Sequence, residues 1–183
     1  MAADPTGDRV VPFARRWHVI HEIDLVRLIA GHRMRSDLCD RLECVADGLP
    51  SRPPADIEAA LCDMLAGAVA RDGRDALARL KALLPGGGGD GFAKGLIGRI
   101  RTRHAADAAA ADELAAALQA AEQRDALGAE ALGYAIRCFV SGCRATIEFE
   151  LLAIVALAGH RLTTPARVLL TERLLPTASD DLH

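Results

Sequence analysis

Apolar residues recur at intervals of three, four and seven along most of this chain, which is the period of one face of an α-helix. The pattern and its breaks predict four long helices, at about residues 23–47, 57–84, 92–121 and 129–160. Asp56 is the predicted N-cap of the second helix. A shorter fifth helix is predicted after these, with Thr164 as its N-cap and Pro165 as its first helical residue.

Four long helices with short connections predict an all-α fold, an antiparallel up-down four-helix bundle with a short fifth helix. Residues 1–22 are predicted to be a lead-in, residues 23–175 the bundle and residues 176–183 a frayed tail. The composition agrees, because much of the apolar half of the chain is alanine and only 3% of residues are aromatic. Alanine favours helices, whereas strands favour aromatic and β-branched residues.

Charge and hydropathy exclude two broad classes of function. A net charge of −3 argues against general nucleic-acid binding, which requires a clustered basic surface. No apolar run approaches the roughly 18 residues that a membrane span needs, and residues 1–16 lack the apolar core of a signal peptide. The chain is therefore predicted to be cytoplasmic. The odd number of cysteines without CxxC spacing indicates buried small apolar side chains, at Cys39, Cys44, Cys62, Cys138 and Cys143.

Three polar residues interrupt the apolar faces of the first, third and fourth predicted helices. His32, His104 and Glu150 each occupy a position that should be buried. Their faces read Leu25, Leu28, His32, Cys39, Leu42, Ala46, then Ile97, Ile100, His104, Ala108, Ala111, Leu114, Leu118, and then Phe139, Cys143, Thr146, Glu150, Ala153, Leu157. An unpaired buried carboxylate is costly, so Glu150 is expected to have a partner or a metal ion, or to be protonated.

Two interpretations of these residues remain open. Bundle cores hold metal sites built from carboxylates and imidazoles on facing helices, and this donor set suits iron, manganese or zinc. In the competing interpretation the residues form a small buried polar network, in which Glu150 accepts a hydrogen bond from one of the histidines.

Several segments resemble the hemerythrin-like (HHE cation-binding) family over about residues 23–175. The segment IDLVRLIAGHRMRSDLCDRLECVADGLP is similar to the family's first helix, where His32 takes the place of a ligand histidine. LIGRIRTRHAADAAAADELAAAL is similar to the third helix, where His104 takes a ligand place. FVSGCRATIEFELLAIVALAGHRLT is similar to the fourth, where Glu150 takes the place of the glutamate.

The resemblance implies a four-helix bundle with a non-haem di-iron centre, used for oxygen binding, for sensing, or for iron and redox handling. Two departures reduce the ligand set. Thr146 stands where the family has a histidine, and the second helix, which ends in ARDGRDALARLKALLP, lacks the family's histidine and glutamate. Asp72 is the best remaining oxygen ligand there, so the expected metal ligands are His32, His104, Glu150 and Asp72.

Two functions from different classes follow. The first is a hemerythrin-like domain that binds metal, with mono- or dinuclear iron and dioxygen as its expected ligands. The alternative is a metal-free, degenerate bundle that serves as a regulatory or protein-interaction module, as a homodimer or with another protein. An enzyme of the di-metal oxidase type is disfavoured, since those bundles carry repeated Glu-x-x-His motifs and the second to fourth predicted helices have none.

Overall fold

The computed structural model describes residues 13–70, 72–83, 91–120, 128–158 and 162–174, and the side chains of residues 13–22, 68–70, 72 and 73 are outside this description. The regular structure of these ranges is helical, which confirms the predicted all-α class. The helices are α1 (Phe13–Gly48), α2 (Ala55–Ala70), α3 (Asp72–Leu83), α4 (Gly91–Gln119), α5 (Ala129–Ala158) and α6 (Thr164–Leu174).

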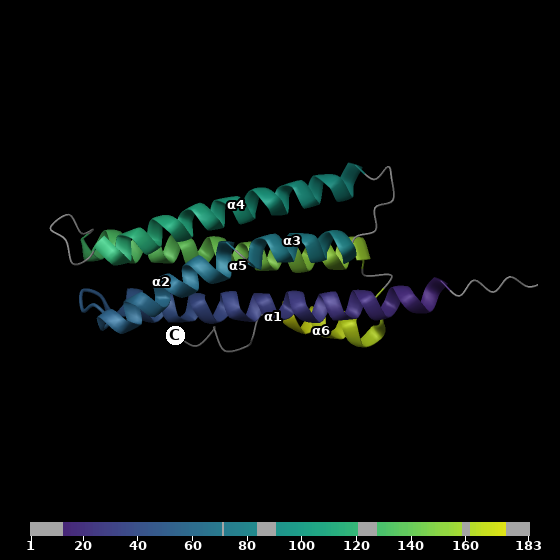
Figure 1. Ribbon diagram of the computed structural model, residues 1–183, viewed down its shortest axis with the longest axis horizontal. Helices are drawn as coiled ribbons and strands as arrows, with labels where there is room; N and C mark the ends of the chain where they lie inside the picture. The colour runs from purple at the N-terminus through teal and green to yellow at the C-terminus, as the bar shows by residue number, and fades with distance from the viewer. Residues whose placement is uncertain (1–12, 71, 84–90, 121–127, 159–161, 175–183) are drawn as a thin grey trace, which may run out of the picture.

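The three longest helices, α1, α4 and α5, run lengthwise, and α2 and α3 follow one another along the same direction (Figure 1). Helix α5 packs against both α1 and α4, α2 packs against α4 and α1, and α3 packs against α1 and α4. The short α6 packs against α5. The apolar faces enclose one core, whose largest fully buried side chains include Leu28, Leu42, Leu80, Ile100, Ile136 and Ile154.

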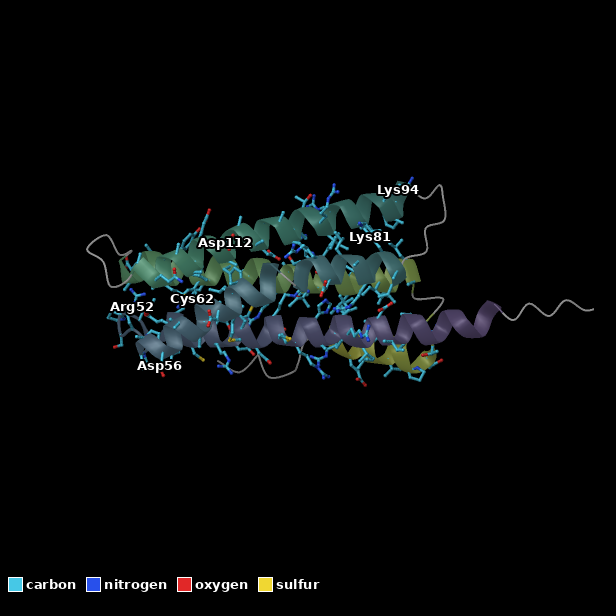
Figure 2. All side chains as sticks on the ribbon, viewed as in Figure 1. Arg52, Asp56, Cys62, Lys81, Lys94 and Asp112 are labelled. Carbon is cyan, nitrogen blue, oxygen red and sulfur yellow. The ribbon has the colours of Figure 1, made fainter. Side chains whose placement is uncertain are left out.

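Polar contacts fix the start of α2 against the end of α4. The Arg52 guanidinium donates to the Glu58 carboxylate at 2.9 Å and to the Leu118 carbonyl oxygen at 3.3 Å. Further along, the Cys62 thiol donates to the Ala115 carbonyl oxygen at 3.7 Å (Figure 2 labels Arg52 and Cys62). These bonds satisfy carbonyl groups of α4, among them one in its last turn, where helices leave carbonyl oxygens without intrahelical partners.

One predicted helix boundary differs clearly from the structure. Helix α1 begins at Phe13 and not near Ile23, so residues 13–22 of the predicted lead-in are helical. Their sequence contains neither glycine nor proline, and Pro12 immediately precedes the helix. The predicted second helix corresponds to α2 and α3, and residue 71 between them lies outside the described residues.

The predicted caps of two helices also need correction. Asp56 lies inside the first turn of α2, and the Ile57 and Glu58 amides both donate to the Pro54 carbonyl oxygen at 3.0 Å. At α6 the Ala166 amide donates to the Thr163 hydroxyl at 3.3 Å, so Thr163 and not Thr164 is the N-cap. Both candidate threonines are good caps by residue type, and only the backbone position distinguishes them.

Replacing Thr163 with alanine is expected to lower the free energy of unfolding by about 1 kcal/mol, because the Ala166 amide loses its acceptor. Thr164→Ala is the matched control, since this exposed side chain does not cap the helix. Urea denaturation of both variants checks the assignment. Equal losses in the two variants would contradict it.

None of the described helices is long and apolar enough to cross a membrane.

Candidate functional site

Three of the four predicted site residues meet in the core, each from a different helix. Glu150 of α5 is fully buried. Its Oε2 lies 2.7 Å from Nε2 of His32 on α1, and its Oε1 is hydrogen-bonded to Nε2 of His104 on α4. The fourth residue, Asp72, is the first residue of α3, and its side chain lies outside the described residues.

A fourth member of this site, Arg35 of α1, was missed by the sequence analysis. Its side chain is buried, and its Nη2 donates to Oε2 of Glu150 at 3.1 Å. Both terminal nitrogens also lie 3.4 Å from Oε1. We call His32, Arg35, His104 and Glu150 the Glu150 cluster.

The spacing of α1 contained a signal for Arg35. Residues Leu28, His32, Arg35, Cys39 and Leu42 follow steps of four, three, four and three, which keep side chains on one inward face. The predicted apolar face passes from His32 directly to Cys39, because arginine is rarely buried without a partner. The partner is Glu150, which lies far away in the sequence.

The donors around Glu150 keep it ionised despite its burial. Burial alone raises the pKa of a carboxyl group. Hydrogen bonds from His104 and His32, together with the positive charge of Arg35, outweigh this and hold the pKa of Glu150 well below its usual range. The pKa of His32 is lowered by burial, although the hydrogen bond and charge of Glu150 oppose this change. Because an ionised carboxylate only accepts hydrogen bonds, Nε2 of His32 carries the proton.

A second polar layer lies beside the cluster, between α4 and α5. Thr146 is buried, and its hydroxyl donates to the Gly142 carbonyl oxygen at 3.0 Å. Asp107 lies one turn beyond His104, and burial raises its pKa while contact with the Thr146 hydroxyl opposes the rise. Oδ2 of Asp107 and Nδ1 of His32 are buried and have no hydrogen-bond partner in the described part of the chain. Asp107 was missed because it follows His104 among alanines, where aspartate is usually exposed.

The cysteines only partly match their predicted burial. Cys39, Cys62 and Cys143 are buried, as expected of small apolar side chains, but Cys44 and Cys138 are exposed. Cys44 and Cys138 lie between the inward-facing residues of α1 and α5, so their side chains point away from the core.

The side chains of the Glu150 cluster bond to one another and do not face a common vacant point. Within the described ranges, no group of three or more His, Cys, Asp or Glu side chains is arranged to hold one. Zinc, for example, needs histidine nitrogen and carboxylate oxygen atoms directed at a common point about 2.0–2.2 Å away. Here the two Nε2 atoms face the carboxylate oxygens themselves, and Arg35 places a permanent positive charge on the same carboxylate. The metal-ligand role of His32, His104, Glu150 and Asp72 stays a prediction.

The unfolding free energy is expected to fall on acidification in two stages. The folded pKa of His32 lies below the unfolded value of about 6.5, so the unfolded chain gains a proton first and stability is lost as the pH falls below about 6.5. The folded pKa of Glu150 is also depressed, so its contribution is present above about pH 4.3 and is lost below it.

Urea denaturation of the wild type and His32→Gln across this pH range checks the first stage. A glutamine amide can still donate to Glu150 but does not titrate. In the variant the unfolding free energy should therefore no longer fall with pH just below about pH 6.5. In the wild type this fall is at most about 1.4 kcal/mol per pH unit for one proton. Both proteins should still lose stability below about pH 4.3. Identical profiles for the two proteins would show that His32 does not titrate between the folded and unfolded states.

Comparison with known proteins gives no match, whether against family models, curated proteins or solved structures. The hemerythrin-like resemblance therefore rests on the sequence segments quoted above.

Proposed function

We propose that this chain is a divergent hemerythrin-like domain, folded as an antiparallel four-helix bundle, in which the Glu150 cluster replaces a metal centre. Its function is that of a regulatory or protein-interaction module. The observation that carries this proposal is the hydrogen bond from the buried Arg35 guanidinium to the Glu150 carboxylate.

The helix contacts support the bundle assignment. Helix α1 contacts α5, α5 contacts α4, and α4 contacts α2 and α3, which in turn contact α1. With α2 and α3 taken together as one side, the helices form a closed ring of four sides. Polar contacts at two separate points of the α1–α5 interface, His32 with Glu150 and Asp47 with Arg137, indicate that these helices run antiparallel. This is the topology that the resemblance implies.

Electrostatics supports a cluster without a resident metal. Arg35 is always charged, and it neutralises Glu150 inside the core. A divalent cation bound at the same carboxylate would lie close to this guanidinium, and their repulsion is poorly screened away from water. A metal ion would therefore require Arg35 to leave a buried position in which Glu150 is its partner.

Exposed apolar side chains support an interaction role. Large apolar residues that are about half exposed or more occur on several helices, at Ile23, Val26, Met34, Ile57, Phe92, Tyr134, Leu152 and Val168. A groove of about 410 Å³ also lies between the end of α1 and α2, and its lining includes Cys44, Val45, Ile57 and Met64. The groove is the connected apolar surface among these features, and such surfaces are typical of sites that bind partners.

A second candidate function is the binding of a single metal ion, iron being the expected one. It is favoured by the convergence of His32, His104 and Glu150 from three helices onto one point of the core. These side chains, with Asp72 of α3, would hold the ion, and bound iron would supply oxygen or redox chemistry.

Metal analysis separates the two functions. The protein is produced in iron-supplemented medium without a histidine tag, and its metal content is measured by mass spectrometry together with an ultraviolet-visible spectrum. The proposal predicts far less than one iron, manganese or zinc ion per chain, in the wild type and in His104→Gln alike. About one ion per chain that is lost in His104→Gln would overturn the metal-free proposal and establish the second function.

A further inference from the structure

Two buried cysteines face one another across the α1–α5 interface. Cys39 and Cys143 have 0% and 1% of their surfaces exposed. Their next neighbours in the chain are also joined, since Nη2 of Arg144 donates to Oδ1 of Asp40 at 2.9 Å. This register brings positions 39 and 143 opposite each other on two helices in contact, close enough for each thiol to shift the pKa of the other.

The two thiols are not equivalent. The interaction with Cys143, together with burial, raises the pKa of Cys39. The same interaction lowers the pKa of Cys143 although burial opposes this, and the nearby charge of Arg35 acts in the same direction as the interaction. Cys143 is therefore the thiol that loses its proton more easily.

The other cysteines have different surroundings. The Cys62 thiol donates to a backbone carbonyl oxygen of α4. Cys44 and Cys138 are exposed. These three cysteines serve as controls on the same chain, because they show how a thiol outside the Cys39–Cys143 pair reacts.

We propose that Cys39 and Cys143 are a redox-active dithiol that a hydroperoxide oxidises to a disulfide, which joins α1 to α5 beside the Glu150 cluster. With hydrogen peroxide, the Cys143 sulfur attacks one oxygen, the O–O bond breaks, and a sulfenic acid forms while the other oxygen leaves as water with the thiol proton. The Cys39 sulfur then attacks the Cys143 sulfur, the S–O bond breaks, and a second water leaves with the Cys39 proton. Two thiols lose two electrons, and one peroxide becomes two waters.

The dithiol lies close to the Glu150 cluster along both α1 and α5. Arg35 lies one turn before Cys39 on α1, and Glu150 lies two turns after Cys143 on α5. A disulfide restricts the separation of its helices to a narrow range, so its formation would fix the α1–α5 spacing next to the Arg35–Glu150 bond. This inference goes beyond the proposed function and does not depend on the metal content of the domain.

The test uses the full chain carrying Cys44→Ser and Cys138→Ser, which removes the exposed thiols and leaves one cysteine in the tryptic peptide 138–144. The protein is treated with hydrogen peroxide, unfolded, alkylated and digested without reduction. The expected product is a cross-link between peptides 36–41 and 138–144 that dithiothreitol cleaves, with Cys62 recovered as an alkylated thiol. The oxidised protein should also melt roughly 10 °C higher, because the cross-link closes a long loop.

Two further variants of this background sharpen the result. Cys62→Ala should still form the cross-link, whereas Cys143→Ala should not. The proposal is overturned if Cys39 and Cys143 are recovered as alkylated thiols, or as separate sulfinic acids, under conditions that fully oxidise Cys44 and Cys138 in the wild type.

Discussion

Replacing Glu150 with glutamine is expected to lower the free energy of unfolding by about 3–5 kcal/mol. The substitution keeps the volume of the side chain but leaves the buried Arg35 guanidinium without its counter-charge, and removing one partner of a buried ion pair costs about this much. The amide nitrogen also faces hydrogen-bond donors, since His32, Arg35 and His104 all donate to the present carboxylate. For a chain of this length the loss corresponds to a melting temperature lower by roughly 6–20 °C.

Urea and thermal denaturation of Glu150→Gln at pH 7.5 measure this effect. Glu148→Gln is the matched control, because Glu148 is two residues away on α5 and exposed. Its change should stay within about 0.5 kcal/mol of the wild type. If the two variants lose equal stability, Glu150 is not the buried counter-charge of Arg35.

The helices could be predicted from sequence because their information is local. Repeated apolar spacing located α1, α4 and α5, and the same spacing showed that His32, His104 and Glu150 point inward. The helix ends were predicted less accurately. Phe13, Trp17 and Ile20 already follow helical steps of four and three, so the first helix could have been extended toward Pro12.

The composition of the site could be predicted only in part, because pairing across helices is not local. Arg35 lay on the inward face by spacing, but its burial is understandable only once Glu150 is opposite it. Asp107 likewise becomes part of the polar core through Thr146 on another helix. The prediction that Glu150 has a partner followed from the cost of burying a carboxylate. Physical reasoning alone could not distinguish a metal ion from an arginine as the source of the compensating charge.

Arg35→Met and Glu150→Leu are expected to be strongly coupled. Arg35→Met leaves Glu150 charged with only the two histidines as donors, and we expect a loss of about 3 kcal/mol. In the double variant no unpaired charge stays buried, so its loss should be about 2–3 kcal/mol smaller than the sum of the single losses. The histidines still lose their acceptor, which prevents full recovery of the wild-type stability.

A double-mutant cycle measured by urea denaturation gives this coupling energy directly. Arg144→Met with Glu43→Leu is the control cycle, because this pair joins the same two helices through bonds of 2.7 Å but is substantially exposed. Exposed ion pairs contribute little, so the control coupling should stay below about 1 kcal/mol. A coupling for Arg35 and Glu150 no larger than that of the control would contradict a desolvated ion pair. Arg35 would then be no obstacle to a metal ion at the Glu150 carboxylate.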